Sequence, residues 1–253
     1  VEQRQFDHGG TRAAMADASD ADLLLFMTQD AIPADEMLVE HLVMQFSLPQ
    51  VKAAYARQLP KPGCSTLEAY TRGFNYPPES DIKDYGDLPK LGLKTFFCSN
   101  VCAMYDRKVY EELGGFVTHT IFNEDMIYAA GLIEAGYSIA YAADAQVYHS
   151  HNYGCIAQMK RNFDLGVSQA QYPEIFEKYP SEGEGIRMVR QTAAYVCRIQ
   201  RPWLLVPLFF QSGFKYLGYL LGKHYQRLPR GVIRHCTMNR NWWKFPVRKR
   251  RKR

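Results

Sequence analysis

Short apolar runs alternate with amphipathic segments along the first half of this chain. The runs at 22–27, 51–56 and 95–105 have the length and residue types of buried strands, and segments with helical features follow them. Such alternation is typical of an α/β domain with helices against a largely parallel sheet. We predict this fold for residues 1–183. The further predicted elements are a loop at 6–12, helices at 11–18, 35–46, 66–74, 107–113, 124–135, 156–167 and 186–199, and strands at 138–142 and 145–149.

The segment 202–223 is apolar and almost long enough to cross a bilayer, but Gln211, Ser212 and Lys215 interrupt its middle. We therefore expect a helix that lies in a membrane interface. A buried hairpin and a membrane span are the alternatives. The side chains expected at headgroup depth or on anionic lipid are Trp203, Lys215, Tyr216, Tyr219 and Lys223.

Charge is divided unevenly along the chain. Residues 185–253 hold 17 of the 31 Lys and Arg and none of the 26 Asp and Glu. A dense cation cluster gains about 1 kcal/mol per residue near an anionic membrane leaflet. Nucleic acid could attract the same cations, but the acidic remainder of the chain would repel it, so we expect no nucleic-acid partner. We predict that residues 184–253 form a helical, basic, membrane-associating region.

Six cysteines are scattered along the chain without a paired framework. Free thiols inside apolar segments are ordinary in proteins of a reducing compartment. We therefore expect an intracellular protein.

Two adjacent acids, Glu124 and Asp125, follow Asn123 at the start of the predicted helix 124–135. Each buried carboxylate raises the pKa of the other, so such a pair usually has a cation, a metal or a proton to handle. Helix capping is the alternative, with Asn123 as the N-cap and both acids in the first turn.

Asp30 follows the apolar run 22–27, which places a carboxylate at the end of a buried strand. Ligands of open α/β sheets bind at this end of the strands. A carboxylate there could hold Mg²⁺ or Mn²⁺, with diphosphate oxygens and water as the other ligands. The alternative is a turn into Pro33, because Asp favours turns.

Several motifs in a fixed order resemble the family-2 glycosyltransferases of the GT-A fold, specifically the bacterial rhamnosyltransferase-like group that builds O-antigen and other surface polysaccharides. Among them, Asn123-Glu124-Asp125 is similar to the family's ED motif, and Thr28-Gln29-Asp30 stands where related enzymes have a DxD metal motif. The other segments that carry the resemblance are 6–12, 99–100, 113–116, 148–151, 158–161, 216–223, 228–229 and 242–243.

The resemblance implies a role for each motif. Asp125, beside Glu124, would take the proton from the acceptor hydroxyl. Asp30 and His149 would hold the metal, Mg²⁺ or Mn²⁺. Contacts to the nucleotide-sugar are implied for His8, Gly9, Gly10, Thr11, Arg12, Gln29 and Arg161, and contacts to the donor or acceptor sugar for Asn100 and Asn123.

Ordinary structural roles remain open for several of these residues. His149 and the neighbouring His151 could be histidines without a metal, because a lone HxH is a weak metal signal. Gly9-Gly10 could be a plain turn before a helix. Asn100 could cap an edge of the sheet, and Arg161 could be a solvated helix cation.

The family resemblance implies an inverting enzyme that transfers a sugar, L-rhamnose from dTDP-L-rhamnose, to a lipid-linked glycan at the cytoplasmic face of the bacterial inner membrane. Family members begin with a strand, a nucleotide-binding loop, a helix and a second strand that have no match here, so we expect an N-terminally incomplete GT-A domain. The alternatives are a truncated, inactive glycosyltransferase and a non-catalytic membrane- or polyanion-binding module.

Overall fold

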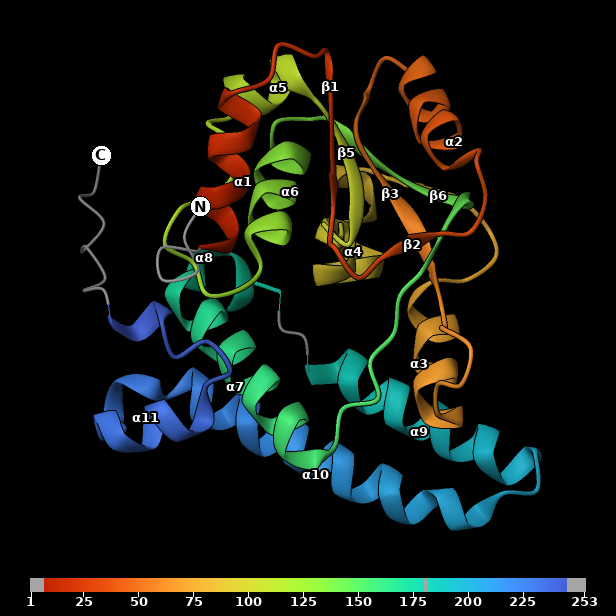
Figure 1. Cartoon of the computed structure of the whole chain (residues 1–253), viewed down its shortest axis with the longest axis vertical. Helices are drawn as coiled ribbons and strands as arrows, with labels where there is room; N and C mark the ends of the chain where they lie inside the picture. The colour runs from red at the N-terminus through yellow and green to blue at the C-terminus, as the bar shows by residue number, and fades with distance from the viewer. Residues whose placement is uncertain (1–6, 180–181, 245–253) are drawn as a thin grey trace.

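The computed structural model describes residues 7–179 and 182–244. One mixed sheet lies at the centre of the described residues, with strand order β1-β5-β3-β6-β2 and β4 paired to β6. Helices α1 and α6 lie on one side of it and α2 on the other, and the C-terminal helices gather below (Figure 1). The strands are β1 Leu23–Met27, β2 Ile32–Pro33, β3 Val51–Leu59, β4 Asp81–Lys83, β5 Cys102–Asp106 and β6 Ser138–Tyr148.

The prediction of a mostly parallel sheet is wrong. Among the described pairings only β3 and β6 run parallel, whereas β5 runs antiparallel to both β1 and β3, and β2 and β4 run antiparallel to β6. A helical segment between two strands does not fix their relative direction. The 42 residues between β3 and β5 are long enough to bring β5 back in the opposite sense.

This topology brings several strand ends to one edge of the sheet. Because β5 is antiparallel to both of its neighbours and β3 is parallel to β6, the strands β1, β3 and β6 share one direction. Their carboxyl ends therefore lie at the same edge, where β5 begins. Residues that follow β1, β3 and β6, and those that precede β5, are neighbours in space.

The helices match most of the predicted segments. The helix predicted at 66–74 begins at Thr66, where Ser65 caps it by accepting a hydrogen bond from the Glu68 amide. The helix predicted at 124–135 ends before Gly136, which has a φ of 88°. The α-helices are α1 His8–Asp17, α2 Leu38–Met44, α3 Thr66–Asn75, α4 Leu88–Leu91, α5 Arg107–Glu112, α6 Glu124–Glu134, α7 Cys155–Gln171, α8 Pro173–Phe176, α9 Glu182–Arg198, α10 Leu205–Lys223 and α11 Arg230–Cys236.

Three local predictions need correction. The loop predicted at 6–12 is wrong from His8 onward, because the Asp7 carboxylate accepts a hydrogen bond from the Gly10 amide and starts α1 there. The strand predicted at 95–105 begins only at Cys102, after a 3₁₀ segment at Gly92–Phe96. The two strands predicted at 138–142 and 145–149 are one continuous strand, β6.

The core has a separate cluster on each face of the sheet. Ala53 and Tyr55 of β3 face a cluster rich in aromatic residues that includes Tyr128 of α6, whereas Ala54 faces the cluster around Leu42 of α2. Successive residues of a strand point to opposite faces, so β3 supports both clusters. This packing fixes the start of α6 over the edge where β5 begins.

Helix α10 packs along α7 through glycine. A Cβ added at Gly218 would lie 2.0 Å from the Met159 carbonyl oxygen, and one added at Gly222 would lie 2.1 Å from that of Phe163. The two helix backbones are therefore in direct contact. A further cluster joins Phe163 of α7 to Ile233 of α11, across the boundary predicted between 183 and 184, and this domain division stays a prediction.

The outer face of α10 is apolar and open. By length and composition, the helix over Pro202–Lys223 could cross a membrane, which alone is weak evidence for a span. Its large exposed side chains recur every three or four residues along one face. They are Trp203, Leu205, Val206, Phe209, Phe210, Tyr216, Leu217 and Leu220.

The polar side chains of α10 point the other way. Tyr219 was expected at headgroup depth, but it is buried and its hydroxyl donates to Gln169. Lys215 was expected on lipid, but it lines an internal cavity with Gln211 and Ser212. The expectation failed because this helix presents its polar side to the protein and its apolar side outward.

Candidate active site

The acid pair at the start of α6 is held by residues from two other elements. Arg12 of α1 donates to Glu124 Oε1 at 2.8 Å, and the Asn100 side chain donates to the same oxygen at 3.3 Å. The Asn100 amide donates to Asp125 Oδ2 at 3.0 Å, and the Met126 amide donates to Oδ1 at 2.8 Å. Asn100 immediately precedes the turn into β5, so the sheet edge positions both carboxylates.

The two acids differ in their charge partners. Glu124 is ion-paired with Arg12, whereas no described cation lies within ion-pair distance of Asp125. Burial, and then the charge of Glu124, raise the pKa of Asp125 to about 7. A carboxylate with this pKa exchanges a proton near neutral pH, which is the property a general base needs.

Asp30, His149 and His151 form a second group, in which one ligand atom from each lies within 4.8 Å of the others. The Asp30 Oδ2 atom is 3.5 Å from His149 Nε2 and 3.3 Å from His151 Nε2. Asp30 follows β1 and both histidines follow β6, so the shared strand direction brings them together. Lys61 donates to the backbone carbonyl of Asp30 at 2.7 Å and holds this turn in place.

Gln58 fixes which nitrogen of His149 carries the proton. Arg72 can only donate, so the Gln58 atom that it contacts is Oε1. The same oxygen lies 2.9 Å from His149 Nδ1, which must therefore be the donor. In neutral His149 the Nε2 lone pair then faces the Asp30 carboxylate.

Two electron pairs that face each other repel unless a cation or a hydrogen-bond donor lies between them. A proton is disfavoured, because burial, and then the charge of Arg72, lower the pKa of His149 to about 4. Carboxylate and imidazole are ligands of divalent transition metals, and the Gln58 contact is the kind that orients a metal-binding histidine. The residues present therefore fit a divalent metal.

A hydrogen-bonded path joins the two groups. Gln58 accepts from His149 Nδ1 through Oε1 and donates through Nε2 to Ser99 Oγ at 3.0 Å. Ser99 adjoins Asn100, whose amide binds Asp125. Both groups therefore lie at the sheet edge where β5 begins.

The predicted nucleotide-sugar residues at the start of α1 have structural contacts. A Cβ on Gly9 would lie 1.8 Å from the Val117 carbonyl oxygen, so close packing requires this glycine. The Gly10 amide is bound by Asp7, whose carboxylate also accepts from His119. Thr11 is half-buried in the same helix. Phosphate contacts by these residues stay a prediction.

The other predicted residues lie around the acid pair. The Arg161 guanidinium stacks 4.9 Å from the Phe122 ring centre and lines a cleft with His8. Gln29 is exposed beside Asp30. Asn123 has a φ of 64°, makes no side-chain cap, and donates to Ser168 instead, so the capping alternative fails for its side chain. Its sugar contact, like that of Asn100, stays a prediction.

Gln58 was not among the residues predicted from the sequence, and of the two histidines only His149 was assigned to the metal. Gln58 lies at the end of β3 and is 2% exposed. A buried amide at the end of an apolar strand is a recognisable signal. Its partner His149 is 91 residues away, so only the fold reveals the contact.

Comparison with known proteins places this chain among the glycosyltransferases. The family model described as glycosyl transferase family 2 matches residues 1–114. The chain is 43% identical to the O-antigen chain rhamnosyltransferase RfbN of Salmonella typhimurium over 96% of its length and 78% of that protein. This chain belongs to glycosyltransferase family 2. A second family member, the O-antigen chain rhamnosyltransferase WbaN of Salmonella anatum, is 42% identical over the same shares.

A solved glycosyltransferase has a similar fold. The mannosyltransferase PcManGT from Pyrobaculum calidifontis, in complex with GDP-Man and Mn²⁺, matches 90% of this chain and 69% of its own, with a TM-score of 0.57 and 14% identity. The GT-A-like α/β fold is thereby confirmed. The chain is a nucleotide-sugar-dependent glycosyltransferase, as the family and its relatives show.

Proposed function

We propose that this glycosyltransferase moves L-rhamnose from dTDP-L-rhamnose, with inversion, onto a lipid-linked surface-polysaccharide acceptor. Similarity to two O-antigen rhamnosyltransferases along 96% of the chain supports the donor and the acceptor class. The observation that carries the mechanism is Asp125, a carboxylate with no ion-pair partner in the described part of the chain and with a pKa of about 7.

Asp125 acts as the base in this proposal. Each of its oxygens accepts one backbone N–H, from Asn100 and from Met126, and keeps a lone pair for the acceptor hydroxyl. As the oxygen of the acceptor hydroxyl attacks the anomeric carbon from the face opposite the leaving group, the hydroxyl proton passes to Asp125. A single displacement of this kind inverts the anomeric configuration.

Glu124 positions this site. Its ion pair with Arg12 ties α1 to the start of α6, and its charge keeps the neighbouring Asp125 basic. Removing the Arg12 partner would leave two uncompensated carboxylates side by side.

Asp30, His149 and His151 would hold a divalent metal, and two imidazoles beside one carboxylate favour Mn²⁺ over Mg²⁺. Such a metal supplies positive charge to the leaving nucleoside diphosphate. Arg161, in the cleft with His8, adds a protein cation for the same negative charge.

The test is the Asp125→Asn variant with dTDP-L-rhamnose and a lipid-linked acceptor. Loss of a general base lowers the rate of transfer by roughly 10²- to 10⁴-fold, and NMR of the wild-type product should show the inverted anomer. Transfer by Asp125→Asn at the wild-type rate would refute the base, and retention of configuration would refute the single displacement.

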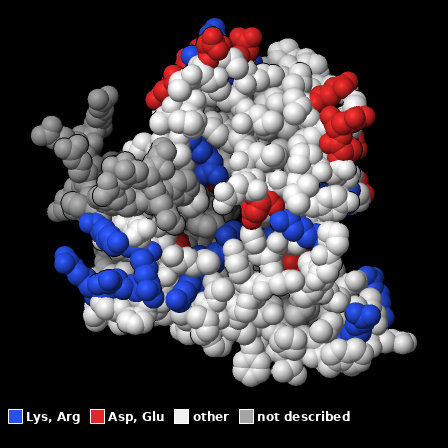
Figure 2. Space-filling view, viewed as in Figure 1, with Lys and Arg blue, Asp and Glu red and all other residues white. Residues whose placement is uncertain are grey.

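We also propose that the protein binds peripherally to the cytoplasmic face of the bacterial inner membrane. The apolar outer face of α10 supports this proposal, with Phe209 73% and Trp203 64% exposed. Lys and Arg side chains gather beside it where α11 lies, and acids gather over α2 (Figures 1 and 2). A purely lipid-binding module would share this surface but would not cleave a nucleotide-sugar.

A further inference from the structure

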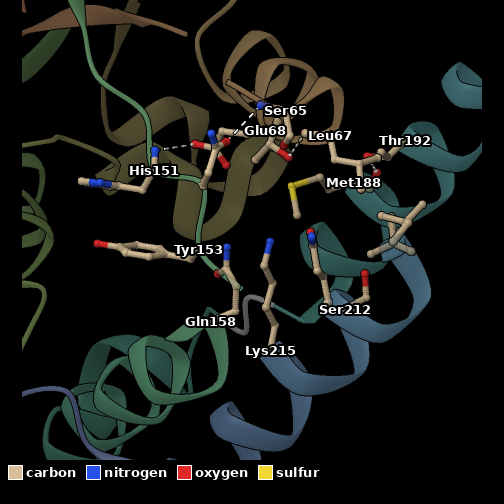
Figure 3. Close-up of a pocket in the computed structure, with 15 residues that line it drawn as sticks. Ser65, Leu67, Glu68, His151, Tyr153, Gln158, Met188, Thr192, Ser212 and Lys215 are labelled. Atoms are coloured by element: carbon tan, nitrogen blue, oxygen red, sulfur yellow. Dashed lines mark hydrogen bonds between the residues drawn. The ribbon is translucent and has the colours of Figure 1, made fainter. Parts of the chain in front are cut away.

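A small polar cavity lies beside the Asp30–His149–His151 group. Its walls come from α3, α7, α9 and α10, and His151 lines it (Figure 3). The polar side chains around it include Glu68, Gln158, Gln211, Ser212 and Lys215. None of the roles proposed above uses this cavity.

Lys215 points its ammonium into the cavity from the inner face of α10 (Figure 3). Among residues 7–179 and 182–244 it has neither a hydrogen bond nor an ion pair. Burial lowers the pKa of Lys215, and the charges of Arg161 and Arg72 lower it further against the opposing effect of Glu68. An ammonium in this position is costly unless an anion accompanies it.

Glu68 does not serve as that anion. Its Oε1 atom accepts from Arg72 Nε at 2.9 Å, an ion pair in which both side chains are largely buried. The carboxylate charge is therefore matched by the guanidinium of Arg72. The ammonium of Lys215 therefore has no ion-pair partner of its own among the described residues.

Gln158 gives a second, independent indication of a ligand. It is 8% exposed, lines the cavity, and its side-chain amide has no hydrogen bond to any described residue. The amide is accessible from the cavity and is available to hydrogen-bond a ligand there. Gln211 and Ser212 add a further amide and a hydroxyl to the same wall.

We propose that this cavity binds a phosphoryl group, with Lys215 as its charge partner and Gln158, Gln211 and Ser212 as hydrogen-bonding neighbours. The cavity volume is about 30 Å³, which holds roughly two or three water molecules. That space suits one phosphoryl group and is too small for a sugar ring.

The inference extends the proposed function, because both proposed substrates carry phosphate. The phosphoryl group belongs either to the nucleoside diphosphate of the donor or to the lipid-linked acceptor. In either case His151 lies between the bound group and Asp30, so the group sits next to the proposed metal ligands.

Binding measurements on the intact chain test the proposal without any transfer assay. The probes are inorganic phosphate, dTDP and farnesyl diphosphate, titrated by calorimetry in EDTA to remove metal-dependent binding. The variant is Lys215→Met, which keeps the length of the side chain and removes its charge. Lys223→Met, eight residues along α10 and outside the cavity, is the matched control.

We expect Lys215→Met to weaken phosphate binding by roughly ten- to a hundredfold, the effect of a lost charge-assisted hydrogen bond. Lys223→Met should bind phosphate like the wild type. A loss with dTDP alone assigns the group to the donor, a loss with farnesyl diphosphate alone assigns it to the acceptor, and a loss with both indicates a shared subsite.

Folding is checked in the same buffers. In the absence of phosphate, Lys215→Met should melt at or above the wild-type temperature, because it removes a half-buried charge that has no ion-pair partner among the described residues. Phosphate should then raise the melting temperature of the wild type but not of the variant. If the folded variant binds all three probes within twofold of the wild type, or the wild type binds none, the inference is overturned, whatever the result for Asp125.

Discussion

Arg12 and Glu124 are 112 residues apart in the chain and form an ion pair of 2.8 Å that ties α1 to the start of α6. This pair neutralises one member of the acid pair, whereas Asp125 has no ion-pair partner among the described residues. In the proposed mechanism this asymmetry divides the roles: Glu124 holds the structure together, and Asp125 exchanges the proton.

The first prediction concerns the pH dependence of transfer. The base must be ionised, and the pKa of Asp125 is about 7. The rate at low substrate concentration should fall about tenfold for each pH unit below 7 and level off above it. Arg12→Gln removes a charge that lowers this pKa, so the midpoint should move to higher pH. Arg107→Gln, which breaks the exposed pair with Glu111, is the control. A flat wild-type profile between pH 5.5 and 8.5 would contradict the assignment.

The same pKa predicts a pH dependence of stability. The pKa of Asp125 is raised from 3.8 to about 7, so between these values the folded chain holds a proton that the unfolded chain releases. The contribution of this group to the free energy of unfolding should therefore fall as the pH rises from 4 to 7. Chemical denaturation at several pH values should show that decline in the wild type and a shallower one in Asp125→Asn. Parallel curves would argue against the buried, protonated carboxylate.

A third prediction tests the metal site without an activity assay. Mn²⁺ should raise the melting temperature of the wild type, and Asp30→Asn should abolish that rise. Gln58→Leu should weaken Mn²⁺ binding roughly 10- to 100-fold, because His149 loses the acceptor that fixes its tautomer. Gln45→Leu, in a half-buried position on the 3₁₀ segment after α2, is the control. Equal Mn²⁺ affinity in wild type and Asp30→Asn would remove the metal from the mechanism.

The backbone contact between α10 and α7 can be tested with two alanine substitutions in α10. Gly222→Ala should destabilise the protein by roughly 1–3 kcal/mol or more, because its Cβ meets the Phe163 carbonyl oxygen. Gly213→Ala faces open space and should stabilise α10 by about 0.5–1 kcal/mol. Urea denaturation measures both. A neutral Gly222→Ala would show that the helices are not in backbone contact.

The membrane proposal predicts binding to vesicles that contain anionic phospholipid. Replacing Phe209 and Phe210 by Ser should lower the partition coefficient by at least about tenfold, since each exposed ring contributes roughly 1.5–3 kcal/mol when buried. Val39→Ser and Val43→Ser, on the exposed face of α2, form the control pair. Vesicle flotation of the Phe variant at the wild-type level would place the lipid contact elsewhere.

Local signals were sufficient for many of the elements. The predicted helices 66–74 and 124–135 agree with α3 and α6, whose ends are set within their own turns by the Ser65 cap and by Gly136. Strand directions could not be predicted, since an apolar run does not specify its partner. The resemblance placed Asp30, Asp125 and His149 among the site residues, and the structure brings them to one edge.

Contacts between residues far apart in the sequence could not be predicted from local sequence patterns. Gln58 meets His149 only because β3 and β6 lie side by side in parallel. The orientation of α10 was misjudged for another reason. Lys215 was expected on anionic lipid, as a cation of an interfacial helix, whereas glycine contacts with α7 turn that side of the helix toward the protein.

The glycine contacts between α10 and α7 fix the orientation of α10 in the enzyme. Because the backbones of α10 and α7 are in contact, α10 cannot tilt independently of α7. A bilayer that contacts the outer face of α10 would therefore also determine the distance of Asp125 from the lipid headgroups. Only an acceptor hydroxyl at that distance from the membrane could be glycosylated. The distance from the outer face of α10 to Asp125 would then determine how far from its lipid a growing glycan is extended.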